Sequence, residues 1–187
     1  MASTRKEIND CVTGILQSLK INSLPVRIED IAKSMGLQVI SYPFTEDISG
    51  TLIVQNNIGI IGFNQFESKV RRRFTIAHEL GHFMLHRDYS DIFLDKQYNA
   101  HVKNDENVKQ YFRVNNPNET ITSQALEQQA NAFAAAILMP EELLRNQVAI
   151  IDFDFGSEEA IKYLARIFDV STQAMSYRLA NLGIFDF

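Results

Sequence analysis

The chain has 187 residues, of which 45% are hydrophobic and 22% charged, as is usual for soluble globular proteins. Its net charge of −5 argues against general affinity for nucleic acids. The single cysteine, Cys11, excludes an intrachain disulfide and a cysteine-rich zinc site, and it favours a reducing, cytoplasmic compartment. We find no apolar stretch of signal-peptide or membrane-spanning length, so we expect no association with a membrane.

The N-terminal part of the chain predicts two helices followed by three strands. Apolar residues at helical spacing mark the helices, with Pro25 before the second and Gly36 placed to end it. Asn56 and Asn57 separate two apolar runs, and because asparagine tolerates positive φ they favour a hairpin. The predicted helices cover residues 4–19 and 28–35, and the predicted strands cover residues 37–42, 51–55 and 58–63.

The rest of the chain predicts mainly helices. Residues 88–122 are polar and irregular, with a candidate strand over 111–116. Pro140 ends one helix and can begin the next. The predicted helices cover residues 67–87, 123–139 and 141–149, and two short ones follow Ser157 and Ser171 as N-caps, the last ending at Gly183.

The order of these elements predicts an α+β fold, because the strands are grouped between helices and do not alternate with them. We expect a small antiparallel sheet packed with helices. We also expect two domains, a main one over residues 1–150 and a C-terminal helix-turn-helix-like pair over residues 151–187 that packs on it.

The segment FTIAHELGHFMLH, residues 74–86, holds three of the chain's four histidines. His78 and His82 are four residues apart, so on a helix they share a face and can reach one metal ion. Glu79 lies beside His78, where its carboxylate can reach a water on the ion without binding the ion. This is the HExxH signature of zinc peptidases, with the glutamate as general base. We therefore expect a zincin-like active-site helix that binds Zn²⁺.

Three surface histidines on a core helix are the competing interpretation. It is weaker because the helix already has an apolar stripe, formed by Val70, Phe74, Ala77, Gly81 and Leu85. Gly81 costs roughly 1 kcal/mol of helix propensity against alanine, which makes sense where another backbone or the metal site approaches closely.

His86 is not expected to be the third ligand. It lies about 12 Å along the helix axis from His78, too far for one ion bonded at about 2 Å. We interpret His86 either as a cation at the helix C-terminus or as a group that supports a ligand.

Glu127 is the predicted third ligand. A carboxylate on this alanine-rich helix is costly unless it is solvated or binds a metal. Asn131, one turn later, can accept a hydrogen bond from a ligand histidine and fix its tautomer. The helix buries its other side through Leu126, Ala130, Phe133 and Ile137. The rival acidic residues are Asp88, Asp91, Asp95, Glu106 and Glu119.

The segments RRRFTIAHELGHFMLH and EQQANAFAAAILMP resemble the ImmA/IrrE family of zinc metallopeptidases, and the likeness extends over nearly the whole chain. The resemblance implies that residues 1–150 form a zinc metallopeptidase domain, with His78, His82 and Glu127 on zinc and Glu79 as base. It also implies a protein substrate, typically a helix-turn-helix repressor that is cleaved to relieve repression. One departure is Gln129 in place of a second glutamate of the family motif. Another is a longer segment between His82 and Glu127.

Two other functions compete. The C-terminal helix pair has the outline of a DNA-binding motif, but residues 157–187 carry a net charge of −1, so we expect no direct contact with nucleic acid. The alternative is a DNA- or protein-binding regulatory module with a structural or inactive zinc site. A structural zinc is less consistent with a carboxylate beside a ligand histidine. The basic run Lys69, Arg71, Arg72 and Arg73 is interpreted as a solvated or acid-paired helix start.

A peptide substrate can lie as an added strand on the sheet edge. Because Glu79 would face an open cleft, we expect its substitution to change folding little. The sequence does not choose among the candidate oxyanion donors, which are Tyr89, Tyr98, His101, Tyr111 and Arg113. It gives no oligomeric state.

Overall fold

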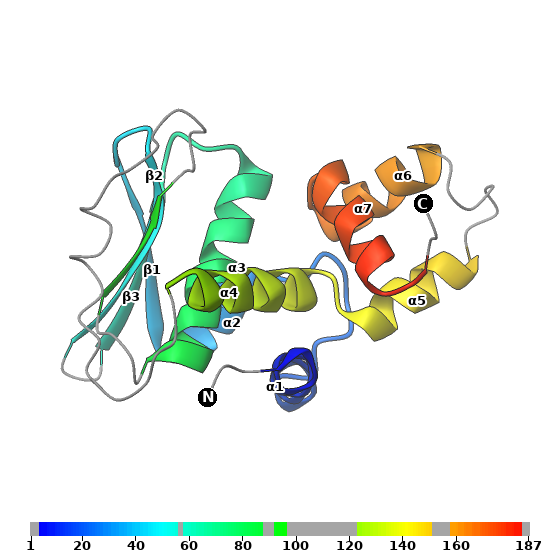
Figure 1. Cartoon of the computed structure of the whole chain (residues 1–187), viewed down its shortest axis with the longest axis horizontal. Coiled ribbons are helices and arrows are strands. Elements are labelled where there is room, and N and C mark those ends of the chain that lie inside the picture. The colour runs from blue at the N-terminus through cyan, green and yellow to red at the C-terminus, as the bar shows by residue number, and fades with distance from the viewer. Residues whose placement is uncertain (1–3, 56–57, 88–91, 97–122, 151–157, 185–187) are drawn as a thin grey trace.

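The computed structural model describes residues 4–55, 58–87, 92–96, 123–150 and 158–184. In chain order its elements are α1 (Arg5–Ser18), α2 (Ile28–Ser34), β1 (Leu37–Tyr42), β2 (Ile48–Gln55), β3 (Ile58–Asn64), α3 (Lys69–His86), β4 (Ile92–Lys96), α4 (Ser123–Leu138), α5 (Glu141–Ile150), α6 (Glu158–Phe168) and α7 (Thr172–Asn181). The fold is α+β, as predicted, with the sheet at one end of the molecule and the described helices on one side of it (Figure 1).

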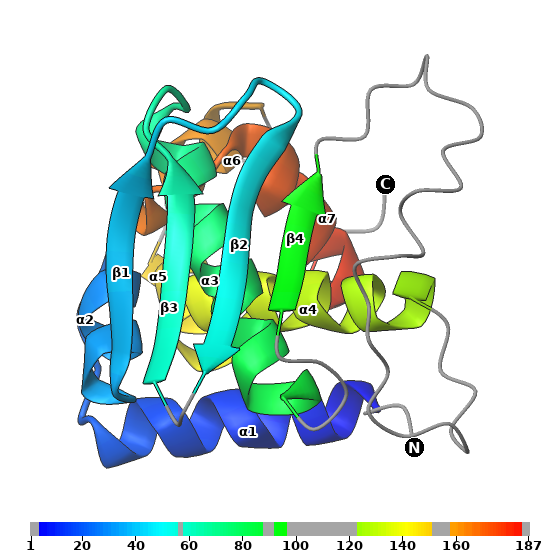
Figure 2. The same cartoon turned by 90° about the vertical axis from the view of Figure 1, so that its left-hand side faces the viewer.

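The four strands form one sheet in the order β1-β3-β2-β4 (Figure 2). The predicted hairpin is confirmed, since β2 and β3 pair antiparallel with Gln55 opposite Ile58. The prediction of a fully antiparallel sheet is wrong, because β1 pairs parallel to β3. The reason is topological: the chain reverses direction between β1 and β2 and again between β2 and β3. After two reversals β3 runs in the same direction as β1, so the two strands pair parallel.

Strand β4 was not predicted. It lies at the start of the segment interpreted as irregular, pairs antiparallel with β2, and buries Phe93 opposite Leu52. Only three consecutive apolar residues mark it in the sequence, so pairing with β2 is what makes it a strand. The candidate strand over 111–116 lies outside the described residues.

Local sequence signals explain the helix ends. Thr4 caps α1 through a capping box with Glu7, and Ser171 caps α7 by accepting from the backbone N–H of Ala174. Gly36 and Gly183 have φ of 83° and 60°, the left-handed conformation that suits glycine after a helix. The predicted cap Ser157 lies in 151–157, outside the described residues.

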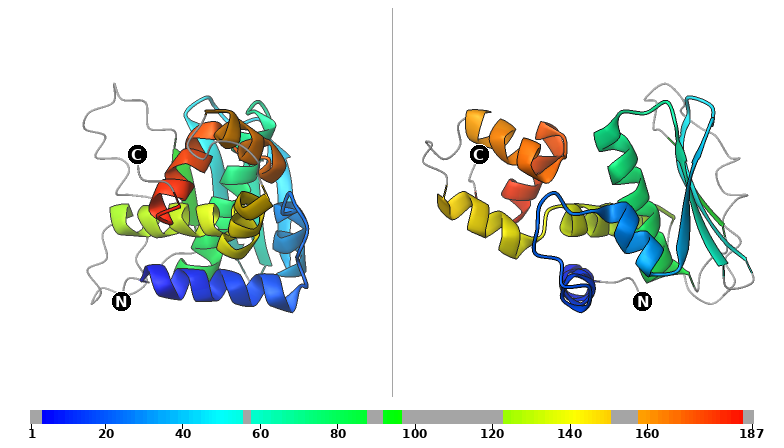
Figure 3. Two further views of the ribbon diagram at one scale, coloured as in Figure 1. Left: turned by 90° about the vertical axis from the view of Figure 1, so that its right-hand side faces the viewer. Right: turned by 180° about the vertical axis from the view of Figure 1, so that it is seen from behind.

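The buried apolar side chains form two clusters. The larger joins α1, α2, the sheet, α3 and α4, and the smaller joins the end of α4 to α5, α6 and α7. Seen from behind, α5, α6 and α7 gather at the end opposite the sheet, with α3 and α4 between (Figure 3). Leu24 and Val170 pack against both clusters. The division into residues 1–150 and 151–187 stays a prediction, and its boundary falls outside the described residues.

None of the helices in the described part of the chain has the length and apolar character needed to cross a membrane.

Candidate metal centre

Helix α3 is the central element of the site. Ser68 caps it by accepting from the backbone N–H of Arg71. The predicted apolar stripe is only partly correct, because Val70 and Phe74 are half-buried while Ile76 and Leu80, outside the stripe, are fully buried. The physical reason is that α3 lies between the sheet and α4, so nearly its whole circumference is covered between residues 73 and 82.

Gly81 allows α3 and α4 to approach closely. A Cβ at this position would lie 3.2 Å from the Cα and the carbonyl oxygen of Ala130 and 3.2 Å from the Cβ of Phe133. The close approach suggested by the sequence is therefore that of a second helix. It matters for the site because α4 carries Glu127.

His78, His82 and Glu127 converge on one point. The Nε2 atoms of the two histidines are 3.0 Å apart, and they lie 3.1 and 3.3 Å from the two carboxylate oxygens of Glu127. Donor atoms bonded at about 2.0–2.1 Å to one tetrahedral ion are about 3.3 Å apart. The triangle of donor atoms thus has the size of one face of a tetrahedral metal site.

The tautomer of His78 follows from its second nitrogen. Nδ1 of His78 lies 3.0 Å from Oδ1 of Asn131, and an amide oxygen only accepts, so Nδ1 carries the proton and donates. Nε2 of His78 then keeps its lone pair toward the other two donors. This is the contact that the sequence suggested for Asn131.

The tautomer of His82 is fixed by a chain of two hydrogen bonds. Nε2 of His86 donates to Oε1 of Gln129 at 2.8 Å, which leaves Nδ1 of His86 as an acceptor. Nδ1 of His82, 3.0 Å away, therefore donates to it, and Nε2 of His82 keeps its lone pair. His86 is thus a supporting group and not a metal ligand.

The electrostatics agree with these assignments. Burial lowers the pKa of His82 to about 4, and burial also lowers the pKa of His86, so both rings are neutral near pH 7 and the interpretation of His86 as a cation is wrong. Two lone pairs and a carboxylate therefore face one another, an arrangement that a cation stabilises. The residues fit a metal ion.

Strand β4 also supports the site. The ring of Phe93 stacks on the ring of His82, with centroids 4.4 Å apart and 25° between the planes. Phe93 is fully buried, so this contact limits the rotation of the imidazole. The sequence carried no signal for this role, because it depends on the pairing of β4 with β2.

Glu79 points away from open solvent. Its exposed fraction is 0%, and a Cβ built at Gly50 of β2 would lie 3.5 Å from its Oε1, so the carboxylate is close to this strand. The expectation that Glu79 faces an open cleft is wrong, because β2 covers this side of α3. Substitution of Glu79 therefore changes a buried group.

The side-chain positions of the rival ligands are not described by the structure. Among the described residues, His78, His82 and Glu127 form the group able to hold a metal ion. The rivals Asp88, Asp91, Glu106 and Glu119 lie outside the described residues, as do the candidate oxyanion donors, and the side chain of Asp95 is not described.

The peptidase family described as the IrrE N-terminal-like domain matches residues 32–180. The chain belongs to this family. The resemblance to ImmA/IrrE proteins is thereby confirmed. Metallopeptidase ImmA of Bacillus subtilis is 28% identical over 119 residues, which cover 64% of this chain and 55% of that protein.

A solved structure has a similar fold. It is a transcriptional regulator of Mycobacterium tuberculosis with a TM-score of 0.56 and 14% sequence identity, covering 94% of this chain and 46% of that chain. The chain therefore spans about half the length of both proteins.

Proposed function

We propose that this protein is a zinc-dependent endopeptidase that cleaves a helix-turn-helix transcriptional repressor and thereby relieves repression. The observation that carries the proposal is the convergence of two imidazole lone pairs and the Glu127 carboxylate, with the Glu79 carboxylate on the same helix as the imidazoles. Membership of a peptidase family and similarity to a metallopeptidase support the reaction class. The substrate is inferred from the family resemblance.

Each residue has a distinct role in this proposal. His78, His82 and Glu127 would hold the ion, and when bound, zinc would polarise the scissile carbonyl and acidify water. Glu79 takes the proton from the attacking water and passes it to the leaving amine. Asn131 and His86 keep the Nε2 lone pairs of the two ligand histidines directed at the ion.

The competing function is a regulatory module with a structural zinc. Structural sites are usually closed by four protein ligands, whereas a catalytic site keeps one position for water. The group found among the described residues has three members. A protein that binds zinc but cleaves nothing would favour this alternative.

The test is direct cleavage. The purified protein is loaded with zinc and incubated with the helix-turn-helix protein encoded beside its own gene, and one specific cut is expected. The variant in which His78, His82 and Glu127 are all alanine should hold no zinc and cut nothing. If the triple variant holds as much zinc as the parent by metal analysis, the assigned ligands are wrong.

Glu79→Gln tests the base. The amide keeps the size of the side chain but accepts no proton, so the cleavage rate should fall about 10²–10⁴-fold while zinc content stays stoichiometric. Because Glu79 is buried, the melting temperature is measured in parallel and rates are compared where both proteins are folded. Glu142→Gln, on the exposed surface of α5, is the control and should cut at the parental rate. If Glu79→Gln cleaves at close to the parental rate, Glu79 is not the general base.

A further inference from the structure

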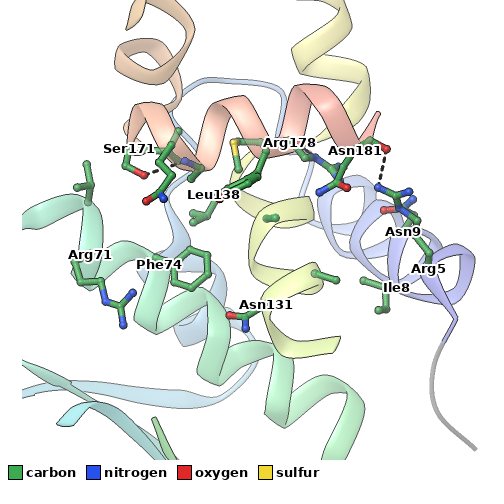
Figure 4. A pocket seen from close by; sticks show the side chains of 18 of the residues that line it. Arg5, Ile8, Asn9, Arg71, Phe74, Asn131, Leu138, Ser171, Arg178 and Asn181 are labelled. Carbon is green, nitrogen blue, oxygen red and sulfur yellow. Dashed lines mark hydrogen bonds between the residues drawn. The ribbon is translucent and has the colours of Figure 1, made fainter. Parts of the chain in front are cut away.

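A groove with a volume of about 600 Å³ runs between α1, α3, α4 and α7 (Figure 4). Most of its lining is apolar and includes Ile8, Val70, Phe74, Leu138, Met139 and Val170. Val70 and Phe74 belong to the stripe that the sequence assigned to the core, and here they are wall residues. Ile8, Leu138 and Met139 are almost fully buried and form the floor of the groove. Val70, Phe74 and Val170 are half-buried and form its walls. An apolar groove of this kind is one that a polypeptide segment covers.

The charged lining of the groove is entirely basic within the described part of the chain. Arg5 and Arg178 lie at one end and Arg71 lies with Phe74 on α3 at the other, and no described carboxylate lines the groove. Arg71 already contacts Glu67 and Ser49. Arg5 donates to a backbone carbonyl, that of Asn181, at 2.7 Å. The end formed by Arg5 and Arg178 is therefore the one that attracts a negative charge.

Arg178 is the unusual member. Its exposed fraction is 5%, and its Nε donates to the carbonyl oxygen of Met139 at 3.1 Å, but it forms no ion pair with any residue in the described ranges. Burial lowers the pKa of Arg178 to about 10, the charge of Glu141 acts against this effect, and the charge of Arg5 adds to it. A buried cation without a direct ion pair is costly, and a carboxylate arriving in the groove would offset that cost.

The groove adjoins the metal centre. Asn131 lines it and also accepts from His78, and the ring of Phe74 lies 6.4 Å from the ring of His78. On α4, Glu127 and Asn131 are one turn apart, and the groove continues along the same helix to Met139. The twelve steps from Glu127 to Met139 span about 18 Å along the helix, which an extended peptide covers in about five or six residues.

We propose that this groove binds a segment of the polypeptide substrate, apolar in sequence and carrying an acidic side chain that pairs with Arg5 and Arg178. The acidic residue would lie about five or six residues from the cleaved bond. This inference rests on the proposed peptidase function and adds to it a determinant of specificity away from the metal. The commitment to a peptide comes from the apolar walls, since a small anion would use only the end near Arg178.

The experiment measures binding without catalysis. Two rhodamine-labelled, amidated heptapeptides of leucine and alanine, which differ only in a central Glu or Gln, are titrated with the zinc-loaded Glu79→Gln protein and followed by fluorescence anisotropy. The expected result is a preference for the Glu peptide of about tenfold or more, the scale of one charged hydrogen bond. Equal affinity for the two peptides would overturn the proposal.

Variants assign the preference to the groove. In the same background, Arg178→Met should reduce the preference to about one and Arg5→Met should reduce it several-fold. Arg166→Met, an exposed arginine of α6 outside the groove, should leave it unchanged. Arg5 is itself exposed at the start of α1, so its variant keeps the test valid if Arg178→Met fails to fold. A preference that survives both groove substitutions would overturn the proposal.

Two further outcomes separate this inference from the proposed function. Competition by sodium acetate at the same molar concentration as the peptide would show an anion site without a peptide groove, and would overturn the inference while leaving the peptidase intact. Conversely, the parent protein could bind the peptides with the expected preference and yet cut no repressor. That result would contradict the proposed function and support the peptide-binding groove.

Discussion

The pairing of His86 with Gln129 decides how His82 presents itself to a metal. The amide oxygen of Gln129 accepts from His86, His86 accepts from His82, and only one tautomer of each ring satisfies both contacts. All three side chains are buried, so water does not substitute for a lost partner. Gln129 therefore acts on the metal site through two intervening imidazole rings, without touching the ion.

Gln129→Met should weaken zinc binding. The change removes the acceptor for Nε2–H of His86 while keeping a side chain of similar length. Loss of such a supporting contact typically costs about 10–100-fold in metal affinity. The zinc dissociation constant is measured by competition with a chromophoric chelator. Gln129→Glu keeps an acceptor and should retain affinity, and Gln128→Met, at the exposed neighbouring position, is the matched control. Equal zinc affinity for the parent and Gln129→Met would contradict the role of this chain of hydrogen bonds.

At the residue scale the sequence predicted those features that one helix determines. The spacing of His78 and His82 specifies a shared face, and the apolar surroundings of Glu127 mark it as unusual. The partners of His82 could not be predicted from the sequence, because they depend on the distance between α3 and α4 and on the stacking of Phe93 on the His82 ring. The roles of the three donors and of Glu79 stay predictions until metal and activity are measured.

At the element scale the site depends on the contact between α3 and α4, because the donor atoms are divided between these two helices. At Gly81 the two helices are in close contact. A larger residue there would push α4, and Glu127 with it, away from the two histidines. Packing at Gly81 and geometry at the metal are therefore coupled.

Gly81→Val should destabilise the protein and weaken zinc binding together. Forcing extra atoms into a packed contact typically costs about 1–3 kcal/mol. Gly14→Val is the matched control, since Gly14 is also helical and exposed, and a Cβ added there would meet nothing within 4 Å. It should be neutral or slightly stabilising, because valine has the better helix propensity. Both variants are compared by thermal denaturation and by zinc titration, and equal behaviour would show that the contact is not tight.

Element prediction succeeded where local signals are strong. The predicted strand over 37–42 matches β1, and the helix predicted over 67–87 is α3 within two residues at its start. It failed for β4, whose short apolar run gains strand character only by pairing with β2, and for the direction of β1 relative to β3. Both failures concern which strand is the neighbour, and no local pattern encodes that.

At the scale of the whole molecule, the C-terminal pair of α6 and α7 is anchored to the helix that holds the histidines. Arg73 of α3 donates from Nε to the carbonyl oxygen of Asp169 at 3.1 Å and from a terminal nitrogen to that of Phe168 at 3.4 Å. The basic run at the start of α3 is thus acid-paired, as one interpretation held, since Lys69 and Arg73 both contact the Asp169 carboxylate.

The helix pair should not bind DNA. Arg178 is buried and Lys162 is paired with Glu158 at 2.6 Å, so among the described residues of the pair Arg166 is the one exposed cation without an ion pair, which is little positive charge for a DNA-binding surface. In a titration of labelled duplex DNA with the whole protein at about 50 mM salt, where phosphate contacts are strong, we expect no binding below micromolar concentration. Sub-micromolar binding that weakens steeply with salt would contradict this expectation and would favour the regulatory alternative.

Loss of the anchor formed by Arg73 should lower the melting temperature. Arg73→Met keeps much of the apolar packing but leaves two carbonyl groups without their donor and a carboxylate with one cation fewer, and breaking a buried charged contact typically costs about 3 kcal/mol or more. For a chain of this length that corresponds to a fall of about 6–12 °C in melting temperature.

Lys69→Met is the matched control, because it removes a second cation from the same carboxylate. The Lys69 side chain is 71% exposed, and an exposed ion pair contributes at most about 1 kcal/mol. Because Arg73 also holds the pair of α6 and α7 against α3, its variant should lose binding of the acidic peptide more than it loses zinc. Equal melting temperatures for the two variants, or loss of zinc with peptide binding intact, would show that this contact does not join the helix pair to the metal site.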